Sequence, residues 1–274
     1  MDLGIVVKFK NLNKIVRLLY DFYSINKLAY KNSRNVDIVK KNSELCDKFN
    51  GERIIILFTG TSINNIDFKL LKDEYVFGCS YLAMHRDFDF LNINFYADID
   101  TWGYRLNYLY CWWLQIIYGK TEPGTRIFLD ASSYEFVKKL HGFREKDTYY
   151  LAFNSTLFDD ASNVSIDIAT PNNAMSFGSF STSICISIYM GFKKIYLVGA
   201  DYTKDPMITG HFYDGVKVIT QQTPELLRMH EIINEYANGR GVTIYNVVDS
   251  GFKSRTFKQI RTKEFEKMIQ QNKK

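Results

Sequence analysis

Two short segments of the sequence carry residues that can hold a nucleotide. The first is an apolar run, 54–58, that leads into Thr59-Gly60-Thr61-Ser62. In a strand-to-helix turn, glycine lets the backbone approach a phosphate or ribose, and the helix that follows presents free N–H groups and the positive end of its dipole. One glycine is weak support without the full G-x-G-x-x-G pattern. An ordinary turn capped by Ser62 or Asn64 accounts for the same residues.

The second segment is the apolar run 194–198, which ends in Gly199-Ala200-Asp201-Tyr202. It predicts a strand that delivers a carboxylate and a phenol to the carboxyl edge of a sheet, where open α/β folds bind their ligands. On spacing alone, Asp201 caps a turn at least as well.

His211 is the histidine whose neighbours best suit a general base. It lies in the predicted loop Gly210-His211-Phe212-Tyr213-Asp214. An imidazole with a pKa near neutrality can take a proton from an acceptor hydroxyl, although most loop histidines have no such role. His230 lies three and four residues after Leu227 and Leu226, so we interpret it as a packing residue.

These segments need a sheet that brings strand ends together. From Arg53 onward, short apolar runs alternate with amphipathic segments, which predicts a Rossmann-like α/β fold with a mostly parallel sheet flanked by helices. Strands are expected at 54–58, 75–79, 93–97, 125–129, 149–152, 194–198 and 242–246, and helices at 63–71, 102–118, 133–140, 179–190, 224–238 and 256–270. We predict that residues 1–50 are an N-terminal helical extension and 51–274 the catalytic domain. The stretches 154–178 and 200–223 read as long functional loops.

Composition fits one large globular domain: 274 residues, 46% hydrophobic and 24% charged. A signal-peptide core and a bilayer-spanning apolar run are both lacking, so we expect a cytoplasmic protein. The net charge is +5, and basic residues gather near the two ends of the chain. This pattern favours solvated helix faces over nucleic-acid binding and leaves open a peripheral contact with anionic lipid. The aromatic-rich stretch 102–113 reads as core rather than as a stacking surface.

Three segments resemble a known family. They are Gly60-Thr61-Ser62-Ile63-Asn64-Asn65-Ile66-Asp67-Phe68, then Tyr75-Val76-Phe77-Gly78-Cys79-Ser80, then 179–202. They are similar to the bacterial CMP-sialic acid sialyltransferases with a Rossmann-like fold. They are equally similar to the wider family of motility-associated glycosyltransferases and 6-hydroxymethyl-dihydropterin diphosphokinase-like proteins. The similarity runs from about Gly51 to Phe257.

The chain departs from the family at several positions of the expected site. Thr59 and Thr61 differ from the family's G-x-G-P-S-L turn. Ser80 stands where the sialyltransferases place an Asn against the nucleotide sugar. In the family's Ser-Gly pair before the long helix, Ser179 matches but Phe180 replaces the glycine.

The resemblance implies an inverting glycosyltransferase of bacterial surface polysaccharide (lipopolysaccharide or capsule) that uses a CMP-activated acidic sugar, such as sialic acid, and a glycan or glycolipid acceptor. It implies that the donor nucleotide is bound by Thr59, Gly60, Thr61, Ser62, Ser80, Asp98, Ser179 and Asp201. Tyr202 would stabilise the departing phosphate and His211 would be the base. The catalytic histidine of the sialyltransferases comes later, just before the helix that here begins at Pro224, where this chain has none. No cofactor or metal is expected to be required.

Two alternatives stay open at this level. In a pterin-type diphosphokinase, Asp98, Asp100 and Asp201 would bind magnesium and ATP. In a non-catalytic module of the same fold, the loops and basic ends would bind a partner, and the changes at Thr61, Ser80 and Phe180 are compatible with that.

Overall fold

A computed structural model describes residues 36–99, 108–152, 166–170 and 178–271. Of the predicted N-terminal extension, the described part comprises α2 (Val36–Lys40) and the 3-10 helix η1 (Lys41–Leu45). This part is attached to the sheet edge, because Asn42 Nδ2 donates to the carbonyl oxygens of Tyr150 at 2.7 Å and Ile168 at 2.6 Å.

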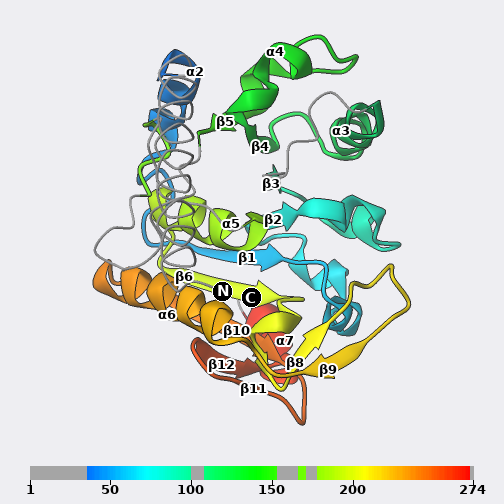
Figure 1. Cartoon of the computed structure of the whole chain (residues 1–274), viewed down its shortest axis with the longest axis vertical. Helices are drawn as coiled ribbons and strands as arrows, with labels where there is room; N and C mark the ends of the chain where they lie inside the picture. The colour runs from blue at the N-terminus through cyan, green and yellow to red at the C-terminus, as the bar shows by residue number, and fades with distance from the viewer. Residues whose placement is uncertain (1–35, 100–107, 153–165, 171–177, 272–274) are drawn as a thin grey trace, which may run out of the picture.

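A single parallel sheet organises the described residues (Figure 1). Its eight strands follow the order β12-β10-β6-β1-β2-β3-β4-β5. Their bounds are β1 Arg53–Leu57, β2 Val76–Cys79, β3 Phe95–Asp98, β4 Arg126–Asp130, β5 Thr148–Leu151, β6 Lys194–Val198, β10 Thr243–Val248 and β12 Lys258–Arg261. The seven expected strands and the Rossmann-like class are therefore confirmed.

The chain reverses its direction of travel across the sheet at β1. From β1 to β5 each strand is added on one side, and β6 then returns to pair with the other side of β1. Such a reversal leaves a crevice at the carboxyl ends of the two strands concerned, where ligands of open α/β sheets bind. The topology thus points to the ends of β1 and β6.

Helices cover both faces of the sheet, which explains why its central strands are almost continuously apolar. Alternate residues of β1 face opposite ways: Ile54 and Ile56 join the core under α5 (Gly178–Tyr189) and α6 (Pro224–Gly239). Ile55 and Leu57 join the second core, which receives residues from the helices α3 (Tyr108–Lys120), α4 (Tyr134–Val137) and α7 (Thr262–Gln271).

Two helix predictions were wrong in part. The segment 63–71 forms two 3-10 helices, η2 (Thr61–Asn65) and η3 (Phe68–Leu71), because Ile66 is extended and the Asp67 side chain caps the second by accepting from Lys69 N. The segment 256–270 begins instead with β12, which pairs with β10, and becomes helical only at Thr262. Residues 258–261 form a strand because they pair with β10 at the edge of the sheet, and the local sequence pattern does not indicate this pairing.

The stretch 200–223 is more ordered than expected. It contains the 3-10 helix η9 (Asp201–Thr203), the strand β7 (Lys204–Asp205), which pairs with β11 (Lys253–Ser254), and a hairpin of β8 (Met207–Thr209) and β9 (Val218–Thr220). Most of 154–178 lies outside the described residues. The remaining 3-10 helices are η4 (Ser80–Met84), η5 (Phe88–Phe90), η6 (Ala131–Ser133) and η7 (Glu145–Asp147). Within the described ranges, no helix is both long and apolar enough to cross a bilayer.

Candidate functional site

A cavity of about 340 Å³ lies at the carboxyl ends of β1 and β6, where the topology predicts a ligand. Seven of the residues expected from the sequence line it: Thr59, Gly60, Ser80, Ser179, Asp201, Tyr202 and His211. Hydrophobic lining comes from Phe58, Phe180 and Ile208. Its volume falls in the range of about 300–1,000 Å³ typical of small-molecule pockets.

A larger hollow, of about 600 Å³, lies at the opposite, amino edge of the sheet beside Arg53, Glu74 and Lys194. Its most prominent groups are already paired, since Arg53 Nε donates to Glu74 Oε2 at 2.8 Å. Parallel sheets bind ligands at the carboxyl edge, so the smaller cavity is the candidate site.

Gly60 allows a close contact between the ends of two strands. Its φ of −63° suits any residue, but a Cβ there would lie 2.3 Å from the Gly199 carbonyl oxygen and 2.8 Å from Asp201 Cγ. Gly199 has a φ of +70°, and a Cβ on it would lie 2.5 Å from the Phe58 carbonyl oxygen. The two glycines let the turns after β1 and β6 touch, with Gly60 N donating to Gly199 O at 2.9 Å.

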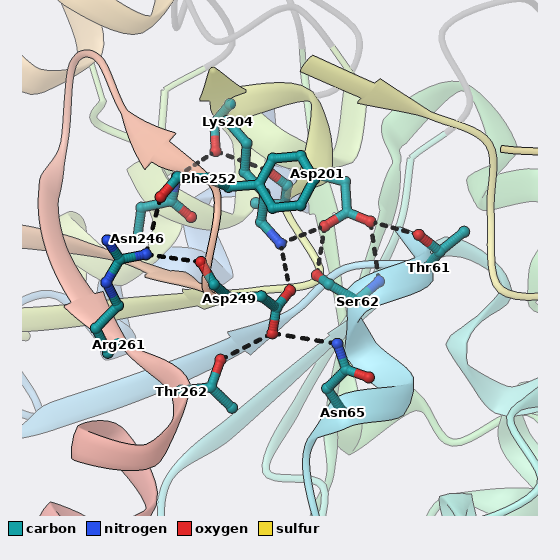
Figure 2. Close-up of polar contacts among 12 residues, drawn as sticks. Thr61, Ser62, Asn65, Asp201, Lys204, Asn246, Asp249, Phe252, Arg261 and Thr262 are labelled. Carbon is teal, nitrogen blue, oxygen red and sulfur yellow. Dashed lines mark hydrogen bonds and ion pairs between the residues drawn. The ribbon is translucent and has the colours of Figure 1, made fainter. Parts of the chain in front are cut away.

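The segment after this turn does not offer the helix N-terminus that was expected to bind an anion. The segment is a 3-10 turn, and its Ser62 N–H already donates to Asp201 Oδ2 at 2.9 Å. Thr61 Oγ1 donates to the same carboxylate oxygen at 3.0 Å, and Ser62 Oγ donates to Oδ1 (Figure 2). Both hydroxyls are therefore used to fix the turn.

Asp201 is the centre of a buried ionic network (Figure 2). Its side chain is 1% exposed, and Lys204, which is fully buried, contacts it at 2.9 Å. Burial tends to raise the pKa of Asp201, but the charge of Lys204 and the hydrogen bonds from Ser62 outweigh it and hold the pKa below its usual value. With both oxygens engaged, Asp201 positions the wall of the cavity.

The network continues from Lys204 to the next strand. Lys204 Nζ also contacts Asp249 Oδ2 at 3.1 Å. Asp249, just after β10, accepts from Asn65 Nδ2 at 3.1 Å and from Thr262 Oγ1 at 3.0 Å (Figure 2). Through Asp201 and Asp249, Lys204 joins the ends of β6 and β10 to the turn after β1 and to the start of α7. Sequence analysis missed it, although the Asp201-to-Lys204 spacing of three was a usable signal.

The loop that carries His211 is attached directly to the turn after β1. His211 forms an antiparallel bridge with Gly60, and Phe212 N donates to Thr59 O at 2.9 Å. The imidazole Nδ1 lies 2.8 Å from Thr59 Oγ1, and the ring stacks on Tyr213 with centroids 5.0 Å apart. In the tautomer with its proton on Nδ1, the ring donates to Thr59 and leaves the Nε2 lone pair for a substrate.

Thr59 lines the cavity and also contacts His211 through its side chain. Its hydroxyl orients the imidazole of His211, as a residue that fixes a catalytic base would do.

Ser80 and Ser179 bring two hydroxyls together in the cavity, with their Oγ atoms 2.9 Å apart. Ser80 has a φ of 49°, a conformation that costs a non-glycine residue about 1–2 kcal/mol. The Tyr96 hydroxyl, which donates to Ser80 O and accepts from Ala83 N at 3.1 Å, fixes this turn. Strained backbone of this kind is concentrated at functional sites.

Tyr202 and Phe180 line the inner part of the cavity, and His230 packs behind them. Tyr202 packs against Phe180 with ring centroids 5.0 Å apart, and His230 lies 5.2 Å from Phe180. Burial raises the pKa of Tyr202 well above its usual value, so the phenol stays protonated and can donate a hydrogen bond. Phe180 is buried and joins the core.

His230 predicts a specific acid sensitivity. It is fully buried, neither ring nitrogen has a hydrogen-bond partner among the described residues, and burial lowers its pKa to about 4 from 6.5. A lowered pKa in the folded state means that the unfolded chain binds the proton first, so stability falls as the pH drops from 6.5 toward 4. At pH 4.5 the imidazole of His230 lowers the free energy of unfolding by about 2–3 kcal/mol relative to neutral pH.

His230→Phe is therefore expected to lose less stability than the wild type between pH 7 and pH 4.5. Urea unfolding of both proteins at the two pH values measures the difference. His141→Phe, an exposed site, is the control and should follow the wild type. Equal losses in wild type and His230→Phe would mean that His230 is not buried neutral.

Asp98 is not brought into the cavity. It ends β3, two strands and about 10 Å from β1, and is 9% exposed. Asp100 lies outside the described residues. Asp98 lies outside the cavity and Asp201 is engaged by Lys204 and Ser62, so these two aspartates of the diphosphokinase alternative are not brought together, and no metal-binding cluster of His, Cys, Asp or Glu occurs in the described segments.

Comparisons with known proteins return structural likeness only. No protein-family model matches this chain, and neither does any curated protein. The solved structure of the sialyltransferase CstII from Campylobacter jejuni with the substrate analogue cytidine-5'-monophosphate is 15% identical, with a TM-score of 0.43, over 72% of this chain and 80% of that one. A sialyltransferase CST-II complex with trisaccharide acceptor and CMP is 16% identical, with a TM-score of 0.40, over 71% and 80%. Similarity at this level transfers neither ligand nor activity, so function is argued from the site itself.

Proposed function

We propose that this chain is a glycosyltransferase that moves a sugar from a nucleotide donor, a CMP-activated acidic sugar, to a glycan or glycolipid of bacterial surface polysaccharide. The observation that carries the proposal is His211, held through Nδ1 by Thr59 at the cavity of the sheet's switch point. A base fixed beside a nucleotide-sized pocket is what transfer to a hydroxyl requires. The choice of CMP rests on the sequence resemblance.

The reaction would be an inverting displacement. His211 Nε2 takes the proton of the acceptor hydroxyl while its oxygen attacks the anomeric carbon from the side opposite the nucleotide. The bond from that carbon to the phosphate oxygen breaks, and CMP leaves with the electron pair. Tyr202 and Ser179, which line the cavity, would donate hydrogen bonds to the leaving phosphate, and Ser179 lies in the first turn of α5, near the positive end of the helix dipole.

Neutral donors of this kind make a metal ion unnecessary for the proposed reaction. The chain would work in the cytoplasm, or at the inner face of the membrane if its basic ends contact lipid. Nucleic acid has no place in this scheme.

A nucleotide screen tests the proposal. CMP and a CMP-sugar are expected to raise the melting temperature, since ligand at a hundredfold excess over Kd stabilises by about 2.7 kcal/mol. UDP, GDP and ADP should not, and chelator should change nothing. Stabilisation by ADP that depends on magnesium would favour the diphosphokinase, and no response to any nucleotide would favour the non-catalytic module.

Ser80→Gly is expected to weaken CMP binding about tenfold, the equivalent of one hydrogen bond of about 1.4 kcal/mol. The same change relieves the positive φ, so the unliganded protein should become slightly more stable. Ser80→Asn is the matched variant, because asparagine tolerates this conformation and offers an amide in place of the hydroxyl. Calorimetric titration with CMP measures the affinities, and unchanged affinity in Ser80→Gly would remove Ser80 from the donor site.

A further inference from the structure

His85 lies between the turn after β2 and the loop that carries His211, and no step of the proposed reaction uses it. Its side chain is only 2% exposed. It directly follows the 3-10 helix η4, whose first residue is Ser80, and its N–H donates to Leu82 O at 2.8 Å. A polar ring buried this deeply is stable only with hydrogen-bond partners and close packing, and His85 has both.

Both ring nitrogens of His85 have partners, and these partners fix the tautomer. Nδ1 accepts the N–H of Asp87 at 3.1 Å, so it carries no proton. Nε2 lies 3.0 Å from Asn64 Oδ1 and donates to it. Asn64 belongs to η2, the turn after β1 that Asp201 holds through Ser62, so the imidazole joins that turn to the end of η4.

The surroundings of His85 keep its ring neutral. Burial lowers the pKa of His85 from its usual value of 6.5, while the carboxylate of Asp87 opposes this shift and the guanidinium of Arg86 adds to it. A second proton on the ring would have to be placed on Nδ1, where it would face the Asp87 N–H. The imidazole of His85 is therefore neutral, and its plane is set by its two hydrogen bonds.

The ring contacts of His85 extend to the loop that carries His211. The imidazole packs on Phe68 of η3, with ring centroids 4.5 Å apart. Phe212 meets the imidazole at 5.0 Å, with an angle of 66° between the ring planes. Phe212 directly follows His211, and its N–H donates to Thr59 O at 2.9 Å. The loop is thus held through its main chain by Thr59 and through the Phe212 ring by His85.

We propose that His85 is a positioning residue for His211 and acts through Phe212. This inference rests on the proposed glycosyltransferase function, in which His211 takes the proton of the acceptor hydroxyl. His85 does not line the cavity, but Phe212 and His211 are neighbours on one short loop. A shift of the Phe212 ring therefore turns the backbone that aims the imidazole of His211. A displacement of about 1 Å at a catalytic group can cost about 100-fold in rate.

A double-mutant cycle tests the route through Phe212. His85→Ala and Phe212→Ala are each expected to lower kcat about tenfold, with the KM for the CMP-sugar within about twofold of the wild type. The double variant should also lose about tenfold rather than about a hundredfold, because the two rings act as one unit. His85→Phe keeps a ring between Phe68 and Phe212 and should restore kcat to within about threefold of the wild type.

Ile127→Val is the control for a general loss of packing. It removes a methyl group on β4, three strands from β1, from the core cluster against which Phe212 packs. We expect its kcat to equal that of the wild type. Melting temperatures of all variants check that they are folded.

Two measurements do not require sugar transfer. The chain has four histidines, and the nitrogen-15 NMR shifts of their imidazoles should show His85 neutral at pH 7, with its proton on Nε2. Hydrogen exchange at the Phe212 amide should become at least about tenfold faster in His85→Ala and stay at the wild-type rate in Ile127→Val.

Additive losses in the double variant, a wild-type kcat in His85→Ala, or unchanged exchange at the Phe212 amide would each overturn the positioning role. A proton on Nδ1 of His85 would overturn it as well, because the ring could not accept from Asp87. If the wild type transfers no sugar while His85→Ala still speeds exchange at Phe212, His85 holds the loop and the proposed glycosyltransferase function is wrong.

Discussion

Replacing His211 with alanine is expected to slow sugar transfer about 10²- to 10⁴-fold, the usual contribution of a positioned general base. CMP affinity should change less than about twofold, because in the proposed reaction the imidazole acts on the acceptor hydroxyl and not on the nucleotide. Initial rates with a CMP-sugar and a neutral oligosaccharide, together with calorimetric CMP binding, measure the two effects separately. Retained turnover would exclude His211 as the base.

Two matched variants sharpen this test. His141→Ala removes an exposed histidine away from the cavity and should leave the rate unchanged. Thr59→Val keeps the shape of Thr59 but removes the oxygen that lies 2.8 Å from His211 Nδ1. It should lower kcat about tenfold, the equivalent of about 1.4 kcal/mol, and Thr59→Ser should restore it. A Thr59→Val enzyme as fast as the wild type would show that the threonine does not orient the base.

Replacing Lys204 with methionine is expected to cost about 3–5 kcal/mol of unfolding free energy, because it leaves two carboxylates around a buried site without their cation. Asp201 is 1% exposed and cannot recover its lost partner from water. The turn at Thr61 and Ser62 depends on Asp201, so CMP affinity should fall as well. Chemical denaturation and CMP titration of the purified variant give both quantities.

Lys194→Met is the control, because Lys194 lies ten residues before Lys204 and is exposed. This change should alter the unfolding free energy by no more than about 0.5 kcal/mol. The double variant Asp201→Asn/Lys204→Met should be more stable than the sum of the two single losses predicts, because the uncompensated charge at Asp201 is removed with its partner. If the unfolding free energy of Lys204→Met is less than about 1 kcal/mol below that of the wild type, the contacts of Lys204 with Asp201 and Asp249 are not essential for stability.

The polar side chains of the candidate site fall into three groups. His211, Tyr202, Ser80 and Ser179 face the cavity. Thr59 holds the imidazole of His211, while Asp201 holds the turn at Thr61 and Ser62. Lys204 ties that turn to β10 and α7 through Asp249. Several residues that a motif comparison assigns to the ligand thus serve to shape the pocket.

The sequence by itself determined the fold class and where the site would lie. The runs 54–58 and 195–198 are almost entirely apolar, because strands covered by helices on both faces have no solvent side. Gly60, two residues after the first run, and Gly199, directly after the second, mark the strand ends. Pro224 likewise predicts the start of α6, because its missing N–H costs nothing in the first turn of a helix. In the structure, Thr223 is the N-cap of α6.

Only the tertiary structure decided what each polar residue does. Thr59 and His211 are 152 positions apart and Ser62 and Asp201 are 139 apart, so their pairing depends on β6 returning beside β1. The same return makes Gly60 a contact point for Gly199. β12 was misread as helix because its pairing with β10 leaves no local signal in an edge strand. Local patterns report burial and backbone preference, whereas partners across the sheet are set by the order of the strands.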